Sequence, residues 1–94
     1  MLGQQFQVQL EALKELNAYL PRVINDLQMV MRSYSETVSK LQERGLPMEV
    51  HDKVKSEFYM QSQNFVTQCC GIISEQTIPY VRQQIQGLEG LLNR

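Results

Sequence analysis

The chain has 94 residues, enough for one domain, and 43% of them are hydrophobic, which is typical of a folded protein. Lys and Arg number 9 against 10 Asp and Glu, and no basic cluster appears, so we expect no nucleic-acid partner. No apolar run reaches the roughly 18 residues that a membrane span needs. No signal-peptide pattern appears either. We therefore expect a cytoplasmic location, with export that needs no cleaved signal left open.

The first half of the chain predicts one long helix, from about residue 4 to residue 43. An apolar stripe follows a regular alternation of four- and three-residue steps, which is the heptad spacing of a helix that packs on other helices. Its members are Phe6, Leu10, Leu13, Asn17, Leu20, Ile24, Leu27, Met31, Tyr34, Val38 and Leu41. Leu16, Val23 and Val30 widen the apolar face beside it. Because the heptad phase is the same before and after Pro21, we expect this proline to kink the helix without ending it.

Residues 44–47 predict a tight turn between two arms of nearly equal length. Gly45 suits the left-handed backbone conformation that often follows the last turn of a helix. Pro47 suits the first position of the next helix, with Glu49 near the positive end of that helix. Two helices joined by such a turn favour an antiparallel hairpin.

The second half predicts a less regular arm, with helices at about 48–76 and 79–92. Its apolar residues fall into two runs, and Val66, Cys70 and Ile73 lie beside the first. The first run is Val54, Phe58, Phe65, Cys69 and Ile72, and the second is Ile78, Val81, Ile85, Leu88 and Leu92. The two runs do not share one heptad phase. Pro79 lies at the discontinuity and Thr77 could cap a new helix there, so we expect a bend or a break at this point.

These patterns predict an all-α protein, a single antiparallel helical hairpin domain over residues 1–94 with coiled-coil-like packing. Two helices enclose no interior, so we expect the hairpin to associate into a helical bundle with another helical protein or with itself. The expected interface residues are Leu13, Asn17, Leu20, Ile24, Leu27, Met31, Tyr34, Phe58, Phe65 and Ile72. Tyr19 and Tyr59 lie off the main stripes, and we expect both to be exposed in a lone hairpin.

The sequence gives little sign of catalytic chemistry. His51 is the only histidine, and its neighbours Asp52 and Lys53 suit a solvated first helical turn better than a catalytic site. Cys69 and Cys70 are adjacent, which strains a disulfide between them, and they suit small reduced core residues. No phosphate loop, metal-ligand spacing or nucleophile elbow occurs. We expect no enzyme activity, no metal and no cofactor.

Asn17 is the only polar residue of the first stripe. A single polar residue at such a position can fix the register or the number of helices that associate. Alternatively, Asn17 lies in a part of the arm that faces solvent.

The length, the two arms and the central turn Arg44-Gly45-Leu46 resemble the WXG100, or ESAT-6, family of small helical hairpins. The Trp-x-Gly motif of that family is absent, and Tyr80 is followed four residues later by Gln84 instead of an acidic residue. The resemblance implies a dimer that forms a four-helix bundle, in the role of a type VII secretion substrate, targeting partner or chaperone. Relatives encoded beside LXG toxins bind the helical N-terminal region of the toxin, and this is the form that the resemblance favours.

Three functions follow from these patterns. The first is a secretion-associated partner or targeting chaperone that binds another helical protein. The second is a self-assembling structural bundle made of copies of this chain. The third is an adaptor subunit of a larger coiled-coil complex.

Overall fold

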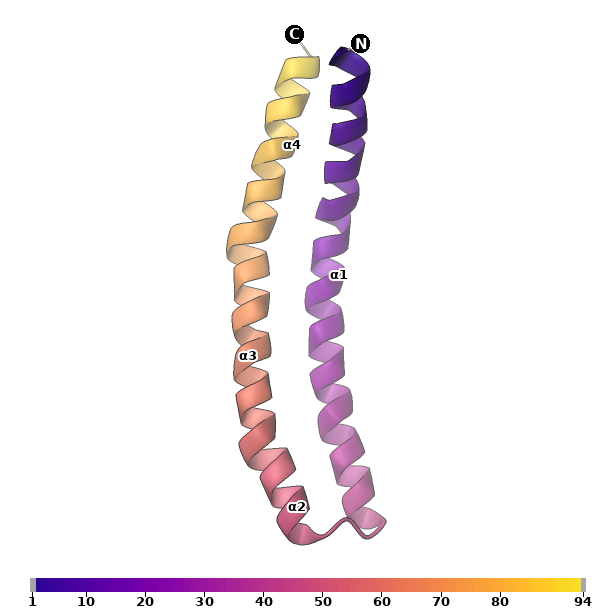
Figure 1. Ribbon diagram of the computed structural model, residues 1–94, viewed down its shortest axis with the longest axis vertical. Coiled ribbons are helices and arrows are strands. Elements are labelled where there is room, and N and C mark those ends of the chain that lie inside the picture. Colours follow the sequence, from indigo (N-terminus) through magenta and orange to yellow (C-terminus); the bar gives the residue numbers. More distant parts are fainter. Residues whose placement is uncertain (1, 94) are drawn as a thin grey trace. The chain divides into compact units, whose positions relative to one another are not determined.

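The computed structural model describes residues 2–93 and is all-α, as the sequence predicts. The first arm is α1 (Leu2–Glu43). After the turn, the second arm contains α2 (Met48–Asp52), the π-helix η1 (Lys53–Phe58), α3 (Tyr59–Ile72), the π-helix η2 (Ile73–Thr77) and α4 (Ile78–Leu92). The two arms run in opposite directions and form an antiparallel helical hairpin (Figure 1).

Pro21 lies inside α1 and does not end it. The helix begins two residues before the predicted start and ends at the predicted residue, Glu43. Proline normally interrupts a helix because its nitrogen carries no hydrogen to donate to the preceding turn. Here the apolar stripe keeps one phase on both sides of the proline, so the same side of α1 packs along its length.

The turn closes α1 with a Schellman motif. The amide of Leu46 donates to the carbonyl of Leu41 at 2.9 Å, and the amide of Gly45 donates to the carbonyl of Gln42 at 3.3 Å. Gly45 has a φ of 112°, which a residue with a side chain rarely adopts. Pro47 precedes α2 as its N-cap and not as its first residue, because its extended backbone lets its carbonyl accept from the amide of His51 at 2.9 Å.

The discontinuity predicted near Pro79 is a π-helical turn and not a gap between helices. Thr77 has helical backbone angles, φ −67° and ψ −52°, and its side chain makes no capping hydrogen bond. The prediction of Thr77 as a cap is therefore wrong. Helical backbone runs from Met48 to Leu92, and Pro79 lies in the first turn of α4, where its missing amide hydrogen costs little.

Each π-helix holds one five-residue step of the side of the second arm that faces α1. In η1 the amide of Tyr59 donates to the carbonyl of Val54, and after η2 the amide of Ile78 donates to that of Ile73. Both bonds span five residues instead of four, so each π-helix accommodates one extra residue. The extra residue resets the heptad phase, which explains why the apolar runs of this arm do not share one.

The hairpin divides into two compact units, although we expected a single domain. Unit 1 contains the chain up to Ile24 and from Gly71 onward, and unit 2 is Asn25–Cys70. Within unit 1, the first part of α1 packs against η2 and α4. Five aliphatic side chains there are at least nine-tenths buried: Leu10, Leu20, Ile78, Val81 and Ile85. Partly buried apolar residues surround this cluster: Leu13, Ile24, Ile73, Leu88 and Leu92.

Unit 2 contains the rest of α1, the turn, α2, η1 and nearly all of α3. Its buried side chains, Met31 and Val38, both belong to α1. No described residue of α2, η1 or α3 is buried. The packing inside unit 2 is therefore much looser than that inside unit 1.

Candidate interaction surface

The interface residues predicted on α1 lie on its packed side. Leu20 and Met31 are 8% and 6% exposed. The others are half-buried: Leu13, Asn17, Ile24, Leu27 and Tyr34. The heptad pattern of the first arm thus identifies the side of α1 that contacts the second arm.

The interface residues predicted on the second arm do not face α1. Phe58, Phe65 and Ile72 are 42%, 67% and 51% exposed. The residues directly after them face α1 instead and are half-buried: Tyr59, Val66 and Ile73. The cause is the five-residue step from Val54 to Tyr59, which rotates the contact side by one residue. The sequence shows the signal in part, since Val66 and Ile73 form a second stripe beside the first.

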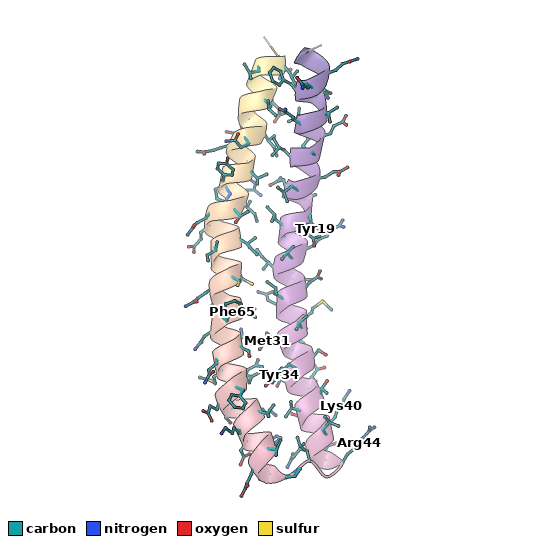
Figure 2. All side chains as sticks on the ribbon, in the orientation of Figure 1. Tyr19, Met31, Tyr34, Lys40, Arg44 and Phe65 are labelled. Carbon is teal, nitrogen blue, oxygen red and sulfur yellow. The ribbon has the colours of Figure 1, made fainter. Side chains whose placement is uncertain are left out.

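A polar and aromatic cluster holds unit 2 together at η1. The hydroxyl of Tyr34 donates to the carbonyl of Val54 at 2.8 Å, and the rings of Tyr34 and Tyr59 lie 5.5 Å apart. The ammonium group of Lys55 donates to the hydroxyl of Ser39. Figure 2 shows Tyr34 between the two arms. Tyr59 was expected to be exposed, and this expectation is wrong because η1 turns it toward α1.

Sequence reasoning also missed the roles of Lys55 and Ser39. Both are polar, and neither belongs to an apolar stripe, so no periodic signal identifies them. Their contact depends on the register between the arms, which only the structure provides.

The outward side of unit 2 carries four residues that we call the Val30–Phe65 face: Val30, Thr37, Phe58 and Phe65. Each directly precedes an inward residue of its helix, and the two members on each helix are seven residues apart. All four are exposed, with Val30 at 62%. The ammonium group of Lys53 lies 5.6 Å from the ring centre of Phe58. Large exposed apolar side chains grouped on one side are typical of a protein interface.

Asn17 is the polar exception inside unit 1. Its side chain is half-buried, and its Oδ1 atom is buried without a hydrogen-bond partner among the described residues. This placement excludes the alternative in which Asn17 faces solvent. An unpaired polar atom in an apolar contact lowers stability.

The remaining polar groups form no enzyme-like arrangement in the part of the chain that the structure describes. His51 Nδ1 and Asp52 Oδ1 lie 3.1 Å apart, and Cys69 and Cys70 are half-buried free thiols. No group of His, Cys, Asp or Glu between residues 2 and 93 could hold a metal ion. Over the same residues, no helix is long and apolar enough to cross a membrane.

A shallow hollow lies on the outer side of α1 in unit 1. It is lined by Ala12, Glu15, Leu16, Ala18, Tyr19 and Arg22. All of these residues come from one helix, and Tyr19 is 55% exposed, as predicted (Figure 2). The hollow has no second wall, so it resembles a site for packing against a side chain more than a small-molecule pocket.

No protein family, curated protein or solved structure matches this chain. The resemblance to the WXG100 family therefore stays a prediction.

Proposed function

We propose that this protein is a non-enzymatic helical interaction protein, a hairpin that packs its exposed apolar side against helices of another polypeptide. The observation that carries this proposal is the exposure of Phe65 and Val30, at 67% and 62%, on the same structural unit. A monomer that worked alone would gain nothing from large apolar side chains in water, whereas an interface buries them. The second arm of unit 2 has no buried residue, so added contacts would stabilise it.

The specific role proposed is that of a secretion-associated partner or targeting chaperone for another helical protein. The resemblance to the WXG100 family in length, hairpin and glycine turn supports this role. A cytoplasmic site of action before export of the partner is part of the proposal.

Co-expression tests this role. The chain, with an affinity tag, is produced together with the product of the adjacent gene, and the eluate is analysed by mass. We expect a stoichiometric complex that Phe65→Asp abolishes, while Met60→Asp leaves it intact. Met60 is the matched control because it is 61% exposed and lies in the same helix, α3, on its other flank. Purification as a stable monomer that never co-elutes contradicts the proposal.

Self-assembly is the second candidate. The observation that favours it is the distribution of charges beside the Val30–Phe65 face. The role of an adaptor in a larger coiled-coil complex uses the same surface, and no separate feature of the described residues favours it.

A further inference from the structure

We infer that the Val30–Phe65 face binds a second copy of this chain, with the two α1 helices antiparallel about a two-fold axis near Ser33. This inference rests on the proposed function and adds the surface, the partner and the register.

The four residues of the face lie on one side of unit 2. Within an antiparallel helix pair, a two-fold axis perpendicular to the plane of the pair relates the two helices. Equivalent positions of the two helices therefore share one side. Val30 precedes Met31, and Phe65 precedes Val66, so they hold equivalent positions. Thr37 and Phe58 hold the same positions next to Val38 and Tyr59.

The opposite side of unit 2 differs in both composition and burial. The residues that follow the inward ones there are polar or small and half-buried, as Ser35, Gln63 and Cys70 show. On the Val30–Phe65 face the equivalent residues are larger, mostly apolar and exposed. The hairpin thus has one side suited to water and one side suited to another apolar surface.

The charges beside the face favour a second copy as the occupant. Asp26 and Lys40 lie on the outer edge of α1, seven residues before and seven residues after Ser33. Both are exposed, and among the described residues the only ion pair is His51–Asp52, so neither is paired within the chain. When two α1 helices run antiparallel with Ser33 at the axis, Asp26 of each copy lies beside Lys40 of the other. The edge of α1 is therefore complementary to itself.

The phenylalanines obey the same symmetry. Phe58 and Phe65 are seven residues apart, and the Tyr34–Tyr59 contact places Ser33 at about the level of their midpoint. The axis that pairs Asp26 with Lys40 therefore also brings Phe58 of one copy toward Phe65 of the other. Their neighbours on the outer edge, Gln61 and Gln68, carry no charge that would oppose this contact.

The exposed area is sufficient for such an interface. The chain exposes 7310 Å². A compact monomer of 10.9 kDa exposes about 5,600 Å². The excess is comparable to the roughly 1,200–2,000 Å² that a specific interface between two proteins buries.

The test measures the mass of the full-length chain by sedimentation equilibrium over micromolar concentrations, under reducing conditions. We expect a dimer, twice the 10.9 kDa of one chain. Phe65→Asp should raise the dissociation constant about 100-fold or more, because each dimer would bury two unpaired carboxylates. Met60→Asp should leave the dissociation constant within about twofold. Helix content by circular dichroism verifies that each variant folds, which we expect because both side chains are exposed.

A charge exchange tests the identity of the partner and the register. Asp26→Lys alone and Lys40→Asp alone should each raise the dissociation constant about three- to tenfold, because like charges then meet twice in the dimer. The double variant Asp26→Lys with Lys40→Asp should return to the parent value, since the pairs are restored with reversed sign. Only a second copy in antiparallel register gives this rescue.

Two results overturn the inference, and they differ in what they imply for the proposed function. A chain that stays monomeric throughout excludes a second copy, and the co-expression experiment then decides whether another protein binds. An oligomer that survives Phe65→Asp but dissociates with Met60→Asp assigns the interface to the other flank and leaves the interaction function intact. A dimer that the double charge variant fails to restore refutes the antiparallel register.

Discussion

Unit 1 and unit 2 are both pairs of antiparallel helical segments, yet they are held together by different means. Unit 1 has five aliphatic side chains at least nine-tenths buried, contributed by both arms. Unit 2 buries Met31 and Val38 from α1 alone, and its arms are joined by the contacts of Tyr34 and Lys55. Unit 1 satisfies its apolar residues within the chain, whereas unit 2 keeps Phe58 and Phe65 at its surface. The difference shows that a hairpin can combine a self-contained half with a half built for a partner.

The largest effect is expected from Val81→Asp in unit 1. Val81 is 3% exposed, so the variant places a carboxylate in the apolar cluster and should destabilise the protein by about 3 kcal/mol or more. Thermal unfolding followed by circular dichroism measures the loss. Val8→Asp is the control, because Val8 is 66% exposed. Equal unfolding temperatures for the two variants would contradict the view that unit 1 carries the core.

Single-residue deletions sharpen the account of the π-helices in unit 2. Deletion of Ser56 shortens the step from Val54 to Tyr59 to four residues, so η1 can become α-helix without moving the contact side. We expect a change in unfolding free energy within about 1 kcal/mol.

Deletion of Asn64, an exposed residue of α3, is the matched comparison. It rotates the rest of the arm by about 100° and should cost about 2 kcal/mol or more. Chemical denaturation measures both variants. Equal costs would show that η1 is not an accommodated insertion.

Asn17→Leu should make unit 1 still more self-contained. The variant removes the buried Oδ1 atom that lacks a partner and adds apolar contact, so we expect a gain of about 1–2 kcal/mol. Denaturation and molecular mass are measured together. An altered number of associated chains would show that Asn17 fixes the stoichiometry, and no change in either quantity would exclude Asn17 from the core.

Tyr34→Phe should give the smallest effect. It removes the hydrogen bond to the carbonyl of Val54, which still accepts from the amide of Tyr59, so the expected loss is about 1 kcal/mol. Amide hydrogen exchange at Tyr59 should become faster, while exchange at Val81 in unit 1 should not change. A loss of protection at both amides would contradict the local role of this contact.

The sequence predicts α1 and the turn well because each depends on local chemistry. A continuous heptad pattern outweighs Pro21, and Gly45 is the residue that a positive φ requires. The second arm is predicted less well because a π-helix depends on how one extra residue is accommodated against the opposite helix. The exposed position of Phe65 follows from that one step at η1 and from no propensity of its own.

The candidate surface could be predicted only in part for the same reason. Phe58 and Phe65 are recognisable as interface residues from their size and spacing. Their outward direction, and the inward direction of Tyr59, require the register that the Tyr34–Val54 hydrogen bond reveals. Polar contacts such as Lys55–Ser39 leave no periodic trace in a sequence.

The short Schellman turn has a consequence for how the chain folds. Tyr34 and Val54 are 20 residues apart in sequence, and Ser39 and Lys55 are 16 apart, so the turn brings these pairs together at a small loss of chain entropy. Leu10 and Ile85, which share the cluster of unit 1, are 75 residues apart. We therefore expect contacts near Gly45 to form early and the better-buried aliphatic cluster to form late. On this pathway, the loosely packed half guides assembly and the densely packed half makes it last.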